Sequence, residues 1–267
     1  MNFGSSKEER QLNAKNHMIE MSRKYAEQIQ YSIDNAYIQT QEYDYSYLGD
    51  TKEGSICKLV DDDTVSALFK TYDKYGTTSK YGVLNFASYR YPGSGFIKGS
   101  KAQEECLCHE STLYNVLKEF DSTFYRDNRS RTYYGLYSNR SIYTPNIIFE
   151  RDGIPMFANV ISIAAPNIAA IKRTNITVSD KYIKEAIDSR ILTIIYLANK
   201  FNIETLILGA FGCGVFKNDP EYIANSFMKQ IKQYSNTKNI IFAVPYSRHN
   251  KSNFLAFDSV LEEYYYF

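Results

Sequence analysis

Residues 83–105 read VLNFASYRYPGSGFIKGSKAQEE, and the order of segments within them indicates the fold class. It opens with the apolar run 83–87, which predicts a buried β-strand. A turn rich in proline and glycine follows at 92–95, and a helical segment starts at Lys101. Strand, glycine turn and helix in this order are typical of a parallel α/β unit.

A second unit of the same kind lies in the C-terminal half. The strand-like run 205–209 leads into the glycine-rich turn 211–216 (FGCGVF), and Pro220 starts a helix that ends at about Tyr234. Ligands of open α/β sheets bind beyond the carboxyl ends of the strands, where backbone N–H groups meet phosphate oxygens. The two turns together therefore predict a diphosphate site. Either turn alone is also explained as a tight strand-to-helix connection.

The rest of the chain alternates in the same way. The expected strands are 56–60, 81–87, 147–150, 156–164, 205–209 and 239–244, and the expected helices are 64 onward, 101–120, 180–201 and 220–234. The clearest helix is 180–201, with its apolar stripe at Ile183, Ile187, Ile191, Ile194 and Ala198. Residues 7 to about 40 predict one or two surface helices. Strands that are apolar on both faces predict an α/β sheet covered by helices.

Composition narrows the class of protein. The 267 residues are 44% hydrophobic and 23% charged with a net charge of +1, which excludes a disordered or coiled-coil chain. Since duplex nucleic-acid binding usually needs a basic excess, no such binding is expected. The polar start, the four cysteines and the lack of a run of about 20 apolar residues predict a cytoplasmic protein without a membrane segment.

An acidic pair stands just after the first glycine turn. Ser100 and Gln103 fit a capping box, which places Glu104 and Glu105 in the first helical turn. Carboxylates are common there because of the helix dipole alone. Neighbours on a helix point about 100° apart, so the two carboxylates are expected to have different roles. A carboxyl beside a bound diphosphate suits glycoside cleavage, where it protonates the leaving oxygen and activates water.

These motifs resemble the signature of bacterial-type poly(ADP-ribose) glycohydrolases, a macrodomain family. The resemblance rests on 83–88, 92–96, 99–105, 111–114, 143–145, 165–167 and 209–220. It implies a three-layer α/β/α macrodomain-like fold with a mixed sheet over residues 51–267. Residues 1–50 are then an N-terminal helical extension packed on that domain. The resemblance implies no metal and no cofactor.

The resemblance also implies the site residues. Glu105 is expected to be the general acid/base, and Glu104 and Asn85 to hold the hydroxyls of the ribose whose bond is cut. The expected ligand-binding residues are Asn85, Gly93, Ser94, Gly95, Gln103, Gly209, Gly212, Cys213, Gly214, Val215 and Phe216. Two positions depart from the family pattern, because Ser94 replaces a glycine and Phe211 stands where tryptophan is frequent.

The implied reaction is hydrolysis of ribose–ribose O-glycosidic bonds with release of ADP-ribose. The implied partners are ADP-ribose, poly(ADP-ribose) and ADP-ribosylated macromolecules, without membrane contact. Three alternatives stay open at this point: a hydrolase of single ADP-ribose units on protein or nucleic acid, an O-acetyl-ADP-ribose esterase, and a non-catalytic ADP-ribose-binding module. Ser94 motivates the last of these, since a side chain in the turn resists a glycine-only conformation.

Other patterns carry less information. Gly93, Gly95 and Gly99 only loosely match a dinucleotide-binding fingerprint. Cys106, Cys108 and His109 do not converge as metal ligands on a helix, and Cys213 has no histidine close in sequence to activate it. The segment 124–143 mixes arginines and tyrosines, which fits a solvated loop first and a lid over a polyanion second. Its arginines are Arg126, Arg129, Arg131 and Arg140.

Overall fold

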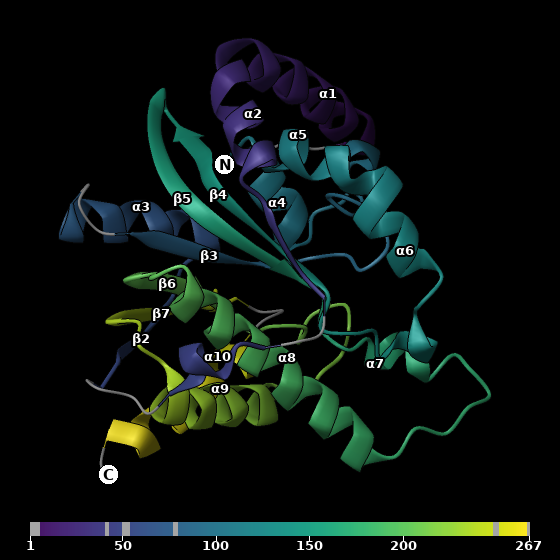
Figure 1. Cartoon of the computed structure of the whole chain (residues 1–267), viewed down its shortest axis with the longest axis vertical. Coiled ribbons are helices and arrows are strands. Elements are labelled where there is room, and N and C mark those ends of the chain that lie inside the picture. Colours follow the sequence, from purple (N-terminus) through teal and green to yellow (C-terminus); the bar gives the residue numbers. More distant parts are fainter. Residues whose placement is uncertain (1–5, 41–42, 50–53, 77–79, 248–250, 266–267) are drawn as a thin grey trace.

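The computed structural model describes residues 6–40, 43–49, 54–76, 80–247 and 251–265. Within them, a seven-stranded sheet has the order β1-β4-β5-β3-β6-β7-β2 (Figure 1). The strands are β1 (Tyr37–Gln39), β2 (Ile56–Val60), β3 (Tyr81–Phe86), β4 (Ser141–Arg151), β5 (Ile154–Ile163), β6 (Thr205–Leu208) and β7 (Asn239–Ala243). β5, β3, β6, β7 and β2 run parallel, whereas β4 pairs antiparallel with both β5 and β1. The sheet is therefore mixed.

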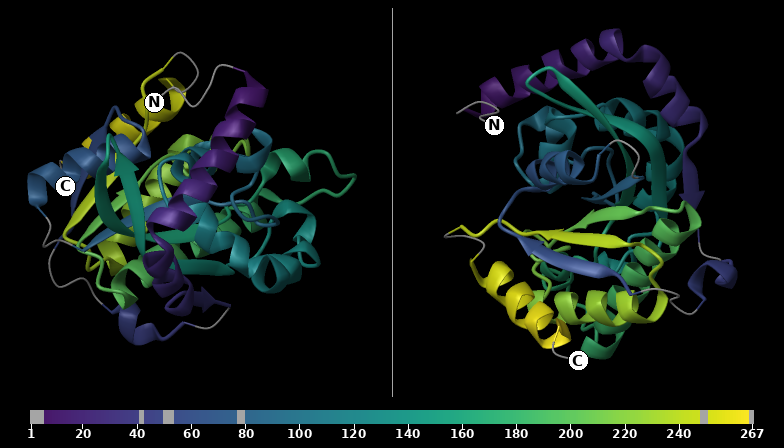
Figure 2. Two further views of the ribbon diagram at one scale, coloured as in Figure 1. Left: turned by 90° about the horizontal axis from the view of Figure 1, so that it is seen from above. Right: turned by 90° about the vertical axis from the view of Figure 1, so that its left-hand side faces the viewer.

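Helices cover both faces of the sheet (Figure 2). One apolar cluster joins the sheet to α8 (Asp180–Lys200), α9 (Pro220–Tyr234) and α10 (Lys251–Tyr265). A second cluster joins the other face to α3 (Thr64–Tyr75), α4 (Gln103–His109), α5 (Leu113–Leu117) and α1 (Lys7–Lys24). The predicted three-layer α/β/α arrangement is confirmed. No helix in the described ranges has the length and apolar character to cross a membrane.

The longest helix shows how the sequence sets the layers. α8 begins after Ser179, whose hydroxyl caps the backbone N–H of Tyr182. Ile187, Ile191 and Ile194 on one stripe are buried against the sheet. Truncating such a side chain to alanine typically costs about 2–5 kcal/mol of stability. Predictions for α8, α9, β2, β6 and β7 are confirmed within one or two residues at each end.

The N-terminal segment contributes α1, α2 (Ala26–Asp34) and the edge strand β1. A capping box between Ser6 and Glu9 starts α1. The side chain of Arg10 then donates to the carbonyl of Gly99 over 2.7 Å, just beyond the first glycine turn. The predicted domain boundary between residues 50 and 51 lies outside the described residues, so this division stays a prediction.

The expected single helix 101–120 is wrong. α4 ends at His109 because the next residues pair with β4: the Glu110 carbonyl accepts from the N–H of Glu150, and the N–H of Thr112 donates to Ile148, both over 2.9 Å. Shorter elements complete the chain: α5, then η1 (Tyr45–Leu48), η2 (Phe96–Lys98), η3 (Lys118–Phe120), the π-helix η4 (Asp121–Tyr125), α6 (Arg126–Arg129), η5 (Tyr133–Gly135) and α7 (Ile168–Ile171).

Candidate active site

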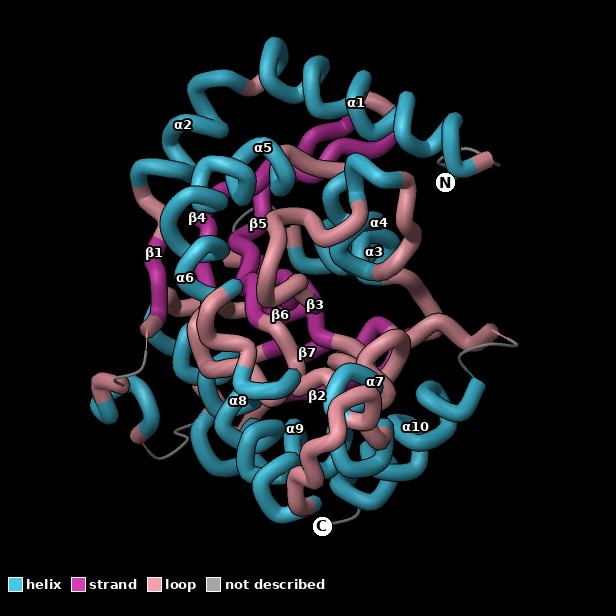
Figure 3. The backbone as a smooth tube through the Cα atoms, turned by 90° about the vertical axis from the view of Figure 1, so that its right-hand side faces the viewer, coloured by secondary structure: helices cyan, strands magenta, loops and turns pink. Residues whose placement is uncertain are grey.

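The two glycine turns follow the carboxyl ends of β3 and β6, which are neighbouring parallel strands. Asn85 on β3 lies beside Ser162 on β5, and the Asn85 Nδ2 donates to the Ser162 Oγ over 3.0 Å. The ring of Phe86, the last residue of β3, contacts the ring of Phe211, which follows β6, edge to face at 5.7 Å. Figure 3 looks onto this end of the sheet, where loops cover the surface. The strand order thus brings together turns that are over 100 residues apart in sequence.

Glu104 is a buried carboxyl that accepts hydrogen bonds through both oxygens. Its Oε1 accepts from the Asn85 Nδ2 over 3.1 Å, and its Oε2 accepts from the backbone N–H of Ser88 over 2.8 Å. Burial raises the pKa of Glu104 to about 8, although both donors lower it. At neutral pH the carboxyl is therefore largely protonated, which suits hydrogen bonding to hydroxyl groups better than proton abstraction.

Glu105 faces the first glycine turn. Its Oε1 accepts from the backbone N–H of Gly95 over 3.0 Å, whereas its Oε2 is buried and has no hydrogen-bond partner among the described residues. The Oδ1 of Asn85 is in the same condition. A buried polar atom left unpaired costs about 1–3 kcal/mol, so two of them here point to a ligand that completes the site. The neighbouring carboxylates have different partners, as their spacing predicts.

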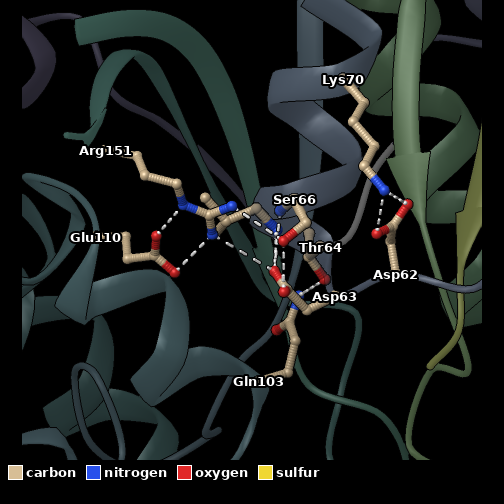
Figure 4. A network of polar contacts seen from close by, with 9 residues as sticks. Asp62, Asp63, Thr64, Ser66, Lys70, Gln103, Glu110 and Arg151 are labelled. Carbon is tan, nitrogen blue, oxygen red and sulfur yellow. Dashed lines mark hydrogen bonds and ion pairs between the residues drawn. The ribbon is translucent and has the colours of Figure 1, made fainter. Parts of the chain in front are cut away.

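Gln103 joins α4 to two other elements. Its Oε1 accepts from the N–H of Phe86 over 2.9 Å, while its Nε2 donates to the carbonyl of Leu84 over 2.8 Å. The same Nε2 donates to the Thr64 Oγ1 over 3.2 Å (Figure 4). These bonds all go to protein groups. Gln103 therefore fixes the start of α4, and its direct contact with a ligand stays a prediction.

The predicted capping box at Ser100 is wrong. α4 begins at Gln103, with Ala102 as its N-cap and no side-chain cap. The reason is that β3 and α3 occupy the carboxamide of Gln103, so it does not reach back to the N-cap residue.

An ionic network supports the site from the side of α3. Arg151 at the end of β4 makes a two-pronged contact with Glu110, at 2.7 and 3.0 Å, and donates to the Ser66 Oγ over 3.0 Å (Figure 4). Asp63 caps α3 through the N–H groups of Val65 and Ser66. Two-pronged arginine–carboxylate contacts are geometrically specific, so the network fixes α3, α4 and β4 relative to one another.

The first glycine turn has left-handed backbone at two successive positions. Gly93 has φ of 60° and Ser94 has φ of 50°. A residue other than glycine reaches this region at a cost of about 1–2 kcal/mol. The serine that departs from the family pattern therefore stands in a strained conformation, but one that it can adopt.

The second glycine turn is tied to the loop after β5. Gly212 has φ of 74°, and the Asn218 Nδ2 donates to the Gly212 carbonyl over 3.0 Å and to the Pro166 carbonyl over 2.8 Å. At the tip, a Cβ on Gly214 would meet nothing within 4 Å, and Val215 is 72% exposed. The tip is thus open to a ligand, whereas the base is held.

Cys213 and Gly209 occupy packed positions in the same region. Burial raises the pKa of Cys213 to about 12, which opposes a role as a thiolate nucleophile. A Cβ on Gly209 would lie 2.7 Å from the carbonyl oxygen of Ala243 and 3.1 Å from the ring of Phe86. Gly209 is therefore required for strand packing, and ligand contact for both residues stays a prediction.

Aromatic rings join the two turns. Phe216, half-buried, lies 6.3 Å from the ring of Tyr137, which stacks on Tyr89 at 4.5 Å. Tyr137 has φ of 61°, and the buried Arg190 holds its segment by donating to the carbonyl of Leu136 over 2.5 Å. Strained backbone of this kind persists where the surroundings fix it, commonly at functional sites.

The structure brings together most of the predicted residues and adds others. Asn85, Glu104, Glu105 and the first turn form one network. Sequence reasoning missed Ser162, Tyr137 and Arg190, because their places depend on strand register and on contacts between distant segments. No group of three or more His, Cys, Asp or Glu side chains in the described part of the chain is placed to hold a metal ion.

The family is shown by sequence. The model for the catalytic domain of microbial-type PARG, poly(ADP-ribose) glycohydrolase, matches residues 4–152, more than half of the chain. The chain belongs to this family. The predicted classification as a poly(ADP-ribose) glycohydrolase, and hence as a glycosidase, is confirmed. No curated protein matched the chain.

Solved structures of bacterial PARG are similar over nearly the whole chain. The enzyme from Thermomonospora curvata bound to the inhibitor ADP-HPD is 25% identical, with a TM-score of 0.82, and the match covers 94% of this chain and 99% of that one. The enzyme from Deinococcus radiodurans in complex with ADP-ribose is 27% identical, with a TM-score of 0.76, over 88% and 98% of the two chains. The predicted macrodomain-like PARG fold is confirmed.

Proposed function

We propose that this PARG cleaves the ribose–ribose bond of poly(ADP-ribose) with Glu105 as the general acid and base. The observation that carries the assignment concerns the buried Glu105 Oε2. It lacks a hydrogen-bond partner in the part of the chain that the structure describes, while Oε1 is held by Gly95. One oxygen is thereby oriented and the other is left for a proton and for the substrate oxygen. A bound ADP-ribose unit in the Deinococcus relative supports the choice of ligand.

The reaction follows from this arrangement. The Glu105 carboxyl gives its proton to the glycosidic oxygen as the bond from that oxygen to the anomeric carbon breaks. The electron pair of that bond leaves with the oxygen, and the ribose becomes an oxocarbenium-like centre. The Glu105 carboxylate then takes a proton from water as the water oxygen attacks. The products are ADP-ribose and a chain shortened by one unit, and Glu105 is again protonated.

Glu104 and Asn85 position the ribose. The protonated Glu104 carboxyl both donates and accepts hydrogen bonds, and the free Asn85 Oδ1 accepts from a hydroxyl. The two glycine turns bind the diphosphate through backbone N–H groups. Phe216 packs against the distal ribose, beside Tyr137. Ser94 fits its left-handed position, which supports an active enzyme over a non-catalytic ADP-ribose-binding module.

The test compares Glu105→Gln, Glu104→Gln and the exposed control Glu119→Gln. We expect Glu105→Gln to lose turnover of poly(ADP-ribose) by about 100-fold or more while it still binds ADP-ribose in calorimetry. Glu104→Gln should weaken both turnover and binding, and Glu119→Gln should change neither. Full turnover in Glu105→Gln would refute the assignment. Wild-type binding of ADP-ribose without cleavage of any ADP-ribosylated substrate would instead favour the binding module.

The substrates in the cell are part of the proposal. We infer that the polymer is presented on ADP-ribosylated macromolecules in the cytoplasm. All four cysteines are free thiols in the structure, which supports a reducing compartment.

A further inference from the structure

Two guanidinium groups lie close to the ring of Tyr91, on the loop after β3. The Cζ of Arg90 is 5.7 Å from the centre of the Tyr91 ring, and the Cζ of Arg129 is 5.6 Å from it. The tyrosine is 49% exposed. An exposed ring flanked by cations offers both a stacking surface and positive charge.

The two arginines differ in what holds them. Arg129 is fixed, because its Nη1 donates to the Asp121 carboxylate over 2.7 Å and to the Arg90 carbonyl over 3.1 Å. The exposed side chain of Arg90 has no carboxylate partner among the described residues. Arg129 therefore orders the ring, and the positive charge of Arg90 is available for an anion.

This group is attached to the catalytic site by hydrogen bonds. The Ser88 Oγ accepts from the N–H of Tyr91 over 3.2 Å and from that of Arg90 over 3.3 Å. The N–H of the same serine donates to Glu104. On the other side, the N–H of Ser94 donates to the Tyr91 carbonyl over 3.2 Å. The backbone that carries Tyr91 is therefore hydrogen-bonded on one side to Ser88, which contacts Glu104, and on the other side to the first glycine turn.

Two of the remaining arginines of the segment have other side-chain contacts. Arg140 donates to the Asn128 Oδ1 over 2.7 Å and lies over the ring of Phe124 at 5.1 Å. Arg126 is 3.3 Å from the Asp127 carboxylate. Of the four arginines noted in the sequence, Arg129 is the one that contacts the Tyr91 ring.

The substrate has a matching part, if the proposed function holds. The oxygen that leaves on cleavage belongs to the adenosine of the next unit in the polymer. That adenosine carries a purine base and its own diphosphate, close to the bond that breaks. Aromatic rings stack on bases, and guanidinium groups pair with phosphates.

We propose that Arg90, Tyr91 and Arg129 form a leaving-side subsite for the adenosine diphosphate part of the neighbouring ADP-ribose unit. The subsite binds the shortened chain that carries the leaving oxygen, and ADP-ribose alone does not reach it. Its effect is therefore on the recognition of polymer.

The test measures two affinities in the same proteins. In a Glu105→Gln background, which prevents cleavage, binding of poly(ADP-ribose) of defined length is compared with binding of ADP-ribose. Tyr91→Ala and Arg90→Ala should each weaken polymer binding about five- to tenfold and leave ADP-ribose binding within about twofold. Tyr91→Phe should retain polymer binding, because the ring remains. In the cleaving protein, the same variants should raise KM for polymer with little change in kcat.

Matched controls are available on the N-terminal helices. Tyr31 on α2 is also 49% exposed, and Arg23 on α1 is exposed. Tyr31→Ala and Arg23→Ala should change neither affinity. Added salt should weaken polymer binding of the parent more than that of Arg90→Ala, because one phosphate contact is missing in the variant.

Two results would overturn the subsite. Unchanged polymer affinity in both Tyr91→Ala and Arg90→Ala would show that the group is only structural. An equal loss of ADP-ribose affinity would place it on the ADP-ribose side of the bond. Failure of the wild type to cleave polymer is a separate result that refutes the proposed reaction, whereas the binding comparison still decides the subsite.

Discussion

The backbone N–H of Gly95 donates to Oε1 of Glu105 over 3.0 Å, and the space beside Gly95 is already filled. A Cβ at this position would overlap the side chain of Ser100 and lie 3.2 Å from the same carboxylate oxygen. The glycine thus does two things: it presents a donor to the Glu105 carboxyl, and it lets the turn approach the start of α4.

The first prediction concerns Gly95→Ala. The added methyl group has to displace Ser100, and the shift disturbs the hydrogen bond from the residue 95 N–H to Glu105. We therefore expect turnover of poly(ADP-ribose) to fall about 100-fold. Gly54→Ala is the control, because a Cβ there meets nothing within 4 Å. Steady-state kinetics together with thermal unfolding of both variants check this. A Gly95→Ala protein with wild-type kcat would contradict the role given to this contact.

Ser94 yields a second prediction. Ser94→Gly relieves about 1–2 kcal/mol of left-handed strain but adds entropy to the unfolded chain, so Tm should move by no more than about 3 °C and kcat/KM by no more than about threefold. Ser94→Val places a β-branched residue at positive φ and should lower kcat/KM more than tenfold.

The control for strain alone is Asp152. Its φ of 53° is also positive, but it lies in the turn between β4 and β5. Asp152→Val should lower Tm without changing kcat/KM. If Ser94→Gly raised activity strongly, the serine would be limiting catalysis, contrary to our interpretation.

These predictions rest on parts of the chain that differ in how far sequence reveals them. α8 follows from its own stripe of isoleucines, which needs no information from elsewhere in the chain. The start of β4 does not follow from its own sequence pattern. The register of β4 against β5 shifts between Thr144 and Ile147, and Asn146 has φ of 53°, so the alternation of side chains breaks there. The strand was therefore predicted only from residue 147.

The contacts of the site also differ in how far the sequence reveals them. Glu105 and Gly95 are ten residues apart in one motif, and the motif was sufficient to connect them. Ser162 reaches Asn85 only because β3 and β5 pair in parallel, which no local pattern reveals. The helix break after His109 has the same origin, because pairing with β4 overrides the helical tendency of 101–120.

Glu104 gives a prediction of stability against pH. Its pKa in the folded protein is raised to about 8 by burial, from an ordinary 4.5. Between these values the folded protein keeps a proton that the unfolded chain releases. The stabilisation is therefore fully present below pH 4.5 and is lost as the pH rises through 8. Each pH unit in this window should remove up to about 1.4 kcal/mol, or about 2–5 °C of Tm.

Glu104→Gln cannot ionise, so its Tm relative to wild type should rise steadily from pH 5 to pH 8.5. Other titrating groups, such as His109, are present in both proteins and cancel in the difference. The exposed control Glu119→Gln should show no such trend. A constant difference across the pH range would mean that Glu104 is ionised in the folded protein throughout.

Gly214→Ala separates ligand contact from folding in the second turn. A Cβ there has no protein atom within 4 Å, and the residue lies next to the exposed Val215. Tm should therefore stay within about 2 °C of wild type. If the backbone of this turn closes on the diphosphate, the methyl group will stand where phosphate oxygens approach, and ADP-ribose affinity should fall about tenfold or more. Calorimetric titration with ADP-ribose and, as a weaker ligand with the same diphosphate, ADP measures the loss. Equal losses for the two ligands would place the clash at the diphosphate, whereas unchanged affinity for both would remove this turn from the binding site.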